Sequence, residues 1–326
     1  MRDARLEGGD NRMVDGFSRK PFASVRPSST NRSPMFAGTF TALVTPFRNN
    51  QIDEQAFTSL IEAQVAGGVT GIVPVGTTGE SPTLDHDEHL RVIELAVKIS
   101  HGRVKVMGGT GSNCTKEAVE YTVAAEKLGA DAALVVAPYY NKPTQEGLYR
   151  HFKAISDATK IPIMLYSIPG RCGIEIAVET VARLAADCRN IVAIKEAGGK
   201  VERVVALKKV VPAAFEILSG DDGLTVSFIK EGAVGVVSVA SNIVPREVSD
   251  LVGTALAGRW DEAQTQHDRL ADLFRDLFIE SNPTPTKQAL AWQGRMTPDV
   301  RLPLCELMPA SQEKLRATLR ALQLVS

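Results

Sequence analysis

The chain has 326 residues, of which 44% are hydrophobic, and its 37 basic and 38 acidic side chains leave a formal net charge of -1. This balance excludes a broad electrostatic surface for nucleic acid or anionic lipid. No stretch approaches the roughly 18 consecutive apolar residues of a membrane span, so we expect no membrane contact. The cysteines have no metal-ligand spacing and follow no secretory signal, which predicts a reduced, cytoplasmic protein; they are Cys114, Cys172, Cys188 and Cys305.

The first 34 residues differ in composition from the rest. They are rich in arginine and serine and poor in apolar side chains, so they cannot bury enough surface to offset their ordering entropy. Four acidic residues among them argue against a transit peptide: Asp3, Glu7, Asp10 and Asp15. We expect residues 1–34 to form a disordered extension, or to lie upstream of a true start at Met35.

From Phe36 onward, short apolar runs alternate with helical periods. The runs are apolar throughout, as expected for strands covered on both faces. Eight strand-then-helix units predict an α/β fold, a single (β/α)8 barrel over residues 35–244, with a doubly wound sheet as the alternative. The predicted strands begin near Thr41, Gly71, Val104, Ala132, Pro162, Ile191, Phe215 and Ala233.

The residues after the eighth predicted strand carry no strand signal. We expect residues 245–326 to form a C-terminal helical region that packs on the barrel or on another subunit. The predicted helices cover Pro245 to Gly258, Trp260 to Glu280, Thr284 to Gln293 and Ser311 to Leu324.

Lys195 is the sharpest chemical signal in the sequence. It follows four apolar residues inside a predicted buried strand, where a lysine is costly unless it is paired or functional. Desolvation lowers the pKa of a lysine and frees its amine for attack on a carbonyl. The alternative is a structural lysine that forms an ion pair with a neighbouring strand, such as with Glu196 turned inward.

Two glycine-containing turns follow predicted strands. Residues Gly76 to Glu80 precede a helix, and their backbone N–H groups suit a carboxylate or phosphate, although a plain turn is the alternative. Residues Gly109 to Cys114 come within one residue of the dinucleotide-binding G-x-G-x-x-G pattern, but cysteine takes its last position and no ribose-binding acid follows. We therefore expect no nucleotide cofactor.

Tyrosine and histidine supply the remaining candidates. Tyr140 and Tyr166 stand at predicted strand ends, where acid–base work would require hydrogen-bonded partners because a free tyrosine titrates near 10. His86 and His89 lie three residues apart near a helix start. A third metal ligand is not evident, so we expect two solvated histidines and no metal site.

At these residues the chain resembles the dihydrodipicolinate synthase family, within the class I pyruvate aldolase and N-acetylneuraminate lyase superfamily. The resemblance runs from Met35 to the C-terminus. The blocks GTTGE and IKEA indicate only the superfamily, whereas PYYNKP and the Arg171 position in YSIPGRCG are narrower. The remaining matching blocks are DHDEH, GTGSN, QEGLYRHF, LSGDD and NPTPTK.

The resemblance implies a reaction and roles for individual residues. Pyruvate would form an imine on Lys195 and condense with L-aspartate 4-semialdehyde to give 4-hydroxy-tetrahydrodipicolinate, in the diaminopimelate route to lysine, without a cofactor or metal. Tyr166 would pass protons, and Thr77 would link it to Tyr140 of a neighbouring subunit. The other implied substrate contacts are Thr77 and Thr78 for pyruvate, Arg171 for the semialdehyde carboxylate, and Val237.

The resemblance also implies a homotetramer, built as a dimer of dimers, and a regulatory site. Lysine-inhibited members bind L-lysine at positions that match Ser81, His86, His89, Asn113, Glu117 and Tyr139. Ser167, Gly170 and Cys172 depart from the family pattern near the second substrate's pocket. Two alternatives remain: another pyruvate aldolase, for 2-keto-3-deoxygluconate or N-acetylneuraminate, and a barrel kept only for binding.

Overall fold

The computed structural model describes residues 34–326, so the predicted extension over residues 1–34 lies outside them apart from Pro34. The described part of the chain starts at the base of a barrel. The Glu216 carboxylate accepts hydrogen bonds from the backbone N–H groups of Met35 (2.6 Å) and Phe36 (2.7 Å). No helix in residues 34–326 combines the length and apolar character that a membrane crossing needs.

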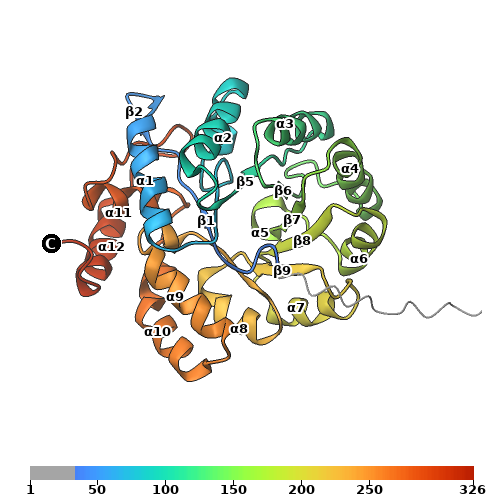
Figure 1. Cartoon of the computed structure of the whole chain (residues 1–326). Coiled ribbons are helices and arrows are strands. Elements are labelled where there is room, and N and C mark those ends of the chain that lie inside the picture. Colours follow the sequence, from blue (N-terminus) through green and yellow to red (C-terminus); the bar gives the residue numbers. More distant parts are fainter. Residues whose placement is uncertain (1–33) are drawn as a thin grey trace, which may run out of the picture. The chain divides into compact units, whose positions relative to one another are not determined.

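Eight parallel strands close into a barrel (Figure 1). The first strand pairs with both the second and the last barrel strand, which rules out the doubly wound sheet. Its observed start is Gly38 rather than the predicted Thr41, because Gly38 and Thr39 already pair with the last strand. The barrel strands are β1 (Gly38–Ala42), β4 (Gly71–Val73), β5 (Lys105–Gly109), β6 (Ala132–Val136), β7 (Ile163–Ser167), β8 (Ile191–Glu196), β9 (Glu216–Ser219) and β10 (Gly235–Ser238).

Helices surround the strands (Figure 1). The second of them starts at a capping box: the Asp85 side chain accepts from the N–H of Glu88, whose carboxylate accepts from the N–H of Asp85. The helices that follow barrel strands are α1 (Glu54–Ala66), α2 (His86–Ser100), α3 (Thr115–Lys127), α4 (Gln145–Ala158), α6 (Val178–Asp187), α7 (Val201–Lys208), α8 (Thr225–Lys230) and α9 (Pro245–Leu256), with a short α5 (Pro169–Cys172) after β7.

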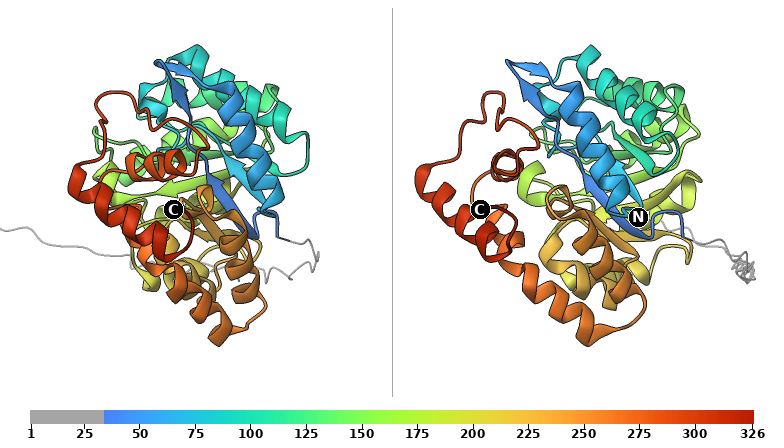
Figure 2. Two further views of the ribbon diagram at one scale, coloured as in Figure 1. Left: turned by 90° about the vertical axis from the view of Figure 1, so that its left-hand side faces the viewer. Right: turned by 60° about the vertical axis from the view of Figure 1, so that its left-hand side comes forward.

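Three further helices extend the chain beyond α9 along one side of the barrel (Figure 2). They agree closely with the predicted segments: α10 (Trp260–Asp276), α11 (Thr284–Trp292) and α12 (Pro309–Ala321). Short elements in the connections were not predicted: the hairpin β2 (Phe47–Arg48) and β3 (Gln51–Ile52), and the 3-10 turns η1 (Ser81–Thr83), η2 (Asp222–Leu224) and η3 (Ala240–Asn242).

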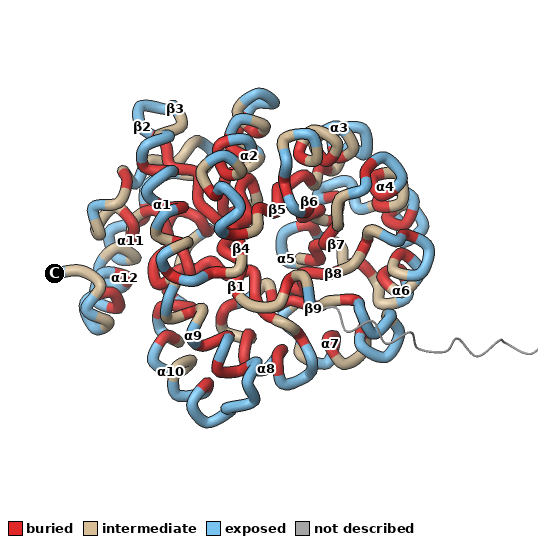
Figure 3. Tube along the Cα trace, viewed as in Figure 1, coloured by how far each residue is buried: buried red, intermediate tan, exposed pale blue. Residues whose placement is uncertain are grey.

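Burial concentrates on the strands and on the inner faces of the helices (Figure 3). The seam where β1 meets β10 is unusually tight. A Cβ atom added to Gly235 would lie 2.0 Å from the carbonyl oxygen of Gly38, its partner in the ladder. Only glycine therefore allows the last strand to close against the first.

Candidate active site

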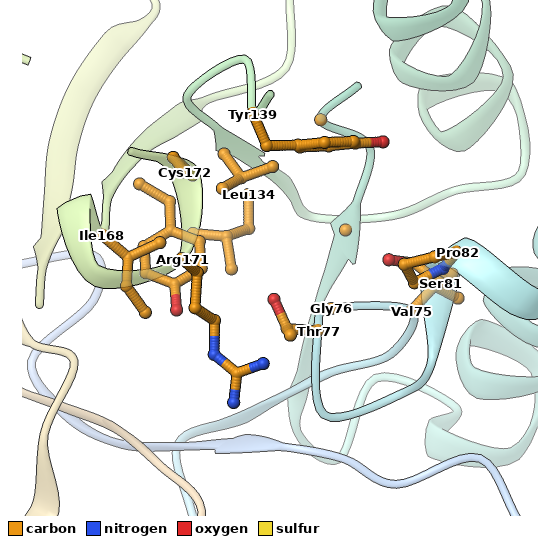
Figure 4. Close-up of a pocket in the computed structure, with 14 residues that line it drawn as sticks. Val75, Gly76, Thr77, Ser81, Pro82, Leu134, Tyr139, Ile168, Arg171 and Cys172 are labelled. Carbon is orange, nitrogen blue, oxygen red and sulfur yellow. The ribbon is translucent and has the colours of Figure 1, made fainter. Parts of the chain in front are cut away.

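A pocket lies where the barrel strands run into their following loops, the end at which barrel enzymes carry their chemistry (Figure 4). Its volume is about 200 Å³. The loop after β4, the strands β5 and β6, and the segment from Tyr166 to Cys172 contribute its walls. Residues from the sequence-based set that line it are Thr77, Ser81, Tyr139, Tyr166 and Arg171, together with Cys172.

Lys195 lies on β8 inside the barrel, with only 5% of its surface exposed. Burial lowers its pKa from 10.5 to about 7; Asp222 opposes this shift and Arg171 adds to it. The alternative pairing with Glu196 is wrong. Successive strand residues face opposite sides of a sheet, and Glu196 binds the Arg203 guanidinium at 2.6 Å outside the barrel.

Tyr166 is the neighbour of Lys195 in the ladder between β7 and β8. The Lys195 ammonium nitrogen lies 4.1 Å from the centre of the Tyr166 ring. Burial raises the pKa of the Tyr166 phenol, and a hydrogen bond with the Thr77 side chain opposes that shift. The phenol is therefore protonated at neutral pH, beside an amine that loses its proton near pH 7.

The loop after β4 is a tight turn that presents Thr77 and Thr78. The N–H of Gly79 bonds to the Gly76 carbonyl at 3.0 Å, and the N–H of Glu80 bonds to the Thr77 carbonyl at 3.1 Å. A Cβ atom at Gly79 would lie 2.9 Å from the backbone nitrogen of Val75, so this close approach requires glycine.

Arg171 reaches the pocket from α5. Its guanidinium extends toward the side of the pocket formed by Gly76 and Thr77 (Figure 4). The Nη2 group donates to the backbone carbonyl of Asn282 at 3.3 Å. The pocket thus contains a guanidinium and a threonine-rich turn, two groups suited to carboxylates.

Four residues of the predicted catalytic and substrate-binding set do not line the pocket of the single chain: Lys195, Thr78, Tyr140 and Val237. Tyr140 is 89% exposed, and its backbone has the left-handed φ of 71°. Val237 is buried in the barrel core on β10. Tyr139, which the sequence placed only in the regulatory set, lines the pocket instead.

The regulatory set lies around α2, α3 and the pocket rim. His86 and His89 stack on the Tyr121 ring, with centroid distances of 5.1 Å and 4.0 Å. The expectation of two solvated histidines is wrong for His89, which is buried and bonds to the Gly109 carbonyl through Nε2 at 2.8 Å. Burial lowers the pKa of His89 to about 4, so it is neutral at physiological pH.

The other members of the regulatory set form hydrogen bonds nearby. Asn113 Nδ2 donates to the Tyr139 carbonyl at 3.2 Å, and Ser112 donates to the Glu117 carboxylate at 2.7 Å. Ser81 and Tyr139 lie on the wall of the pocket itself. In residues 34–326, no group of three potential metal ligands is present.

The sequence-based reasoning missed residues that hold the loops around the site in place. The fully buried Lys287 on α11 forms an ion pair with Glu80 of the β4 loop. The Asp222 carboxylate accepts hydrogen bonds from the N–H groups of Val239 (2.9 Å) and Ala240 (3.0 Å). The block NPTPTK, which contains Asn282 and Lys287, was the only signal that the C-terminal region serves the site.

The departures from the family pattern differ in their relation to the pocket. The Ser167 hydroxyl accepts from the N–H of Ile176 at 3.4 Å and does not line the pocket. A Cβ atom at Gly170 would meet nothing within 4 Å. The Cys172 thiol lies in the wall, where burial raises its pKa to about 11, so it stays protonated.

Comparison with known proteins agrees with this site. The model of the dihydrodipicolinate synthetase family matches residues 35–322. A curated relative, the 4-hydroxy-tetrahydrodipicolinate synthase of Aquifex aeolicus, is 49% identical over 286 residues, which cover 88% of this chain and 97% of that protein. Its name is that of the synthase rather than of a sugar-acid aldolase.

Solved structures give the same answer. The 4-hydroxy-tetrahydrodipicolinate synthase of Methylacidiphilum fumariolicum is 52% identical with a TM-score of 0.86, covering 89% of this chain and 99% of that one. The enzyme of Acinetobacter baumannii, complexed with pyruvate, is 42% identical (TM-score 0.87, 89% and 100% covered). The enzyme of Cyanidioschyzon merolae, with lysine bound, is 39% identical (TM-score 0.88, 90% and 100% covered). The chain therefore belongs to the dihydrodipicolinate synthetase family.

Proposed function

We propose that Lys195 binds pyruvate as an imine and thereby carries the activity of this chain. That activity is the 4-hydroxy-tetrahydrodipicolinate synthase reaction of lysine biosynthesis. The observation that supports the role of Lys195 is its burial inside the barrel with a pKa of about 7, which leaves about half of the amine neutral at pH 7. An ordinary lysine with a pKa of 10.5 would be almost entirely protonated and unreactive at that pH.

Tyr166 supplies the protons that imine formation requires. The neutral Lys195 amine attacks the pyruvate carbonyl carbon, and the resulting carbinolamine loses its hydroxyl as water when a proton is delivered to it. The Tyr166 phenol lies beside the amine and holds its proton at neutral pH, so it is suited to that delivery. Loss of a methyl proton from the iminium then gives the enamine.

The two carboxylates of the substrates use different groups. The turn at Thr77 and Thr78 holds the pyruvate carboxylate through its N–H and hydroxyl groups, and Arg171 pairs with the carboxylate of L-aspartate 4-semialdehyde. The enamine carbon attacks the aldehyde, and the semialdehyde's own amine then displaces Lys195, which closes the ring and frees the enzyme. This order implies ping-pong kinetics.

Tyr140 completes the site from a neighbouring subunit. Its 89% exposure and left-handed backbone hold an aromatic side chain out from the loop after β6, where the chain itself gives it no contact in the pocket. An exposed tyrosine of this kind fits insertion into the pocket of a second copy. We therefore include a homotetramer, a dimer of dimers, in the proposal.

L-lysine inhibits the enzyme at the rim formed by α2 and α3. The proposed ligands are Ser81, His86, His89, Asn113, Glu117 and Tyr139. The relative of known structure from Cyanidioschyzon merolae has lysine bound. In this chain Ser81 and Tyr139 belong to both the rim and the pocket wall, so an amino acid bound there would touch the walls that substrates use.

The test combines turnover with chemical trapping. Purified protein is mixed with pyruvate and L-aspartate 4-semialdehyde and coupled to the next reductase, and pyruvate alone is trapped with borohydride and located by mass spectrometry. We expect turnover and a reduced pyruvate adduct on Lys195, both absent from Lys195→Ala. Trapping on another lysine, or full turnover by Lys195→Ala, contradicts the proposal.

A further inference from the structure

The segment between α10 and α11 touches both substrate-binding elements of the site. Asn282 is buried, and its side-chain Nδ2 donates to the Thr78 hydroxyl oxygen at 2.8 Å. Its backbone carbonyl accepts from Arg171 Nη2 at 3.3 Å. One residue far along the chain therefore contacts the turn proposed for pyruvate and the guanidinium proposed for the second substrate.

A third hydrogen bond holds the Asn282 amide. The Thr286 hydroxyl, fully buried on the first turns of α11, donates to Asn282 Oδ1 at 3.0 Å. The oxygen of the amide is thereby occupied, and its NH₂ group faces Thr78. The three groups form a chain of donors that runs in one direction, from Thr286 through Asn282 to Thr78.

This direction decides what the Thr78 hydroxyl can do. A hydroxyl has one hydrogen to donate and two lone pairs that accept. Because Asn282 supplies a donor to the oxygen, the Thr78 hydrogen stays free, and within residues 34–326 no protein acceptor takes it. A free hydroxyl hydrogen in a buried turn is a donor that suits an anionic carboxylate.

A buried ion pair holds the same turn from the same helix. Glu80 follows the turn with a left-handed φ of 56°, and its carboxylate pairs with Lys287, one residue beyond Thr286 on α11. The Lys287 ammonium also lies 4.1 Å from the centre of the Phe47 ring. The beginning of α11 is therefore fixed against the β4 loop, which keeps Asn282 in place.

We propose that Asn282 is a positioning residue that orients the Thr78 hydroxyl as a hydrogen-bond donor to the substrate carboxylate. The proposal rests on the proposed function of the Thr77–Thr78 turn. Its consequence is selective: loss of the amide weakens the binding of pyruvate, while the backbone carbonyl that Arg171 uses remains.

The test compares three variants by steady-state kinetics and borohydride trapping. Asn282→Ala removes the donor, and we expect KM for pyruvate to rise about tenfold, with KM for the semialdehyde changing less than about threefold. Asn282→Asp keeps the shape but draws the Thr78 hydrogen toward its own carboxylate and adds a charge that repels the substrate, so we expect at least the same rise in KM. Thr286→Val removes the hydrogen bond from the Thr286 hydroxyl to the Asn282 amide and should give a smaller rise in KM for pyruvate.

Asn190 provides a matched control. Its Nδ2 donates to the carbonyls of Ser156 (3.2 Å) and Thr159 (3.1 Å), and it lies just before β8, at the end of the barrel away from the pocket. Asn190→Ala should lower the melting temperature without changing either KM. If it raises KM for pyruvate as much as Asn282→Ala does, the loss is one of general stability and the proposal is wrong.

A double-mutant cycle with Thr78→Val distinguishes an effect that acts through the Thr78 hydroxyl from a general loss of structure. If Asn282 acts through the Thr78 hydroxyl, Asn282→Ala adds little to the rise in KM for pyruvate once that hydroxyl is gone. Fully additive effects overturn the proposal. Absence of a pyruvate adduct on Lys195 in the wild-type protein would instead overturn the proposed function, so the two failures are distinct.

Discussion

Replacement of Lys195 by methionine tests how much the buried lysine destabilises the folded chain. Burial lowers the pKa of Lys195 from 10.5 to about 7. At about 1.4 kcal/mol per pKa unit, this corresponds to a destabilisation of up to about 5 kcal/mol. Methionine has a similar length and no charge, so Lys195→Met should raise the free energy of unfolding while abolishing activity.

The pH dependence of that gain follows from the direction of the pKa shift. Between pH 7 and 10.5 the unfolded chain keeps the Lys195 proton and the folded chain has lost it, so wild-type stability rises with pH in this window. The penalty is complete below pH 7 and disappears near pH 10.5. The opposing charge of Asp222 is already contained in the pKa of about 7, so the expected gain at pH 7 stays at up to about 5 kcal/mol.

Urea unfolding, followed by tryptophan fluorescence at pH 7 and pH 10, measures this difference between the two proteins. We expect Lys195→Met to be the more stable protein at pH 7, with the gap nearly gone at pH 10. A gap that does not change with pH would refute the reasoning, as would a less stable variant at pH 7.

Lys287 is the contrasting buried lysine. Burial lowers its pKa to about 8, and the Glu80 carboxylate beside it opposes the shift. Removal of one partner leaves the other charge buried and uncompensated. Lys287→Met should therefore destabilise the chain by about 3–5 kcal/mol, in the same urea experiment in which Lys195→Met stabilises it.

Three further outcomes are expected. The rate of pyruvate adduct formation, trapped with cyanoborohydride, should rise with pH around a midpoint near 7, because only the neutral Lys195 amine reacts; a midpoint near 10 would show an unperturbed lysine. Arg171→Lys should raise KM for the semialdehyde about tenfold and leave pyruvate trapping unchanged, since an ammonium lacks the planar fork that matches a carboxylate; equal rises for both substrates would argue against a separate role. Millimolar L-lysine should slow turnover, and Glu117→Gln should weaken that inhibition; an unchanged rate would count against the regulatory site.

The barrel could be predicted because its signal is local. Each strand is a short apolar run and each helix has its own period, so the order of elements can be read without knowing any contact. Lys195 was identifiable for the same reason, since a charge inside an apolar run is visible in the run itself. The first strand was misplaced at Thr41 because Gly38 and Thr39 are strand residues only by pairing with β10.

The supporting residues could not be found in this way. Asn282 and Lys287 lie about 200 residues from Thr78 and Glu80, and nothing local in NPTPTK shows which loop it will meet. His89 was expected in solvent because no third metal ligand was evident, but the ring is buried by stacking on Tyr121 from the next helix. These are tertiary contacts, and periodicity does not encode them.

The glycine seam between β1 and β10 has a consequence for how the enzyme matures. The chain is synthesised from its N-terminus, so Gly38 of β1 is made long before Gly235, its partner in β10. Until the last strand emerges, the barrel is an open sheet with an unpaired edge. By then Lys195, Tyr166 and Arg171 have all been synthesised, but Asn282 and Lys287 have not. A chain that ends soon after α9 has every reacting group and lacks the C-terminal contacts that fix the β4 turn.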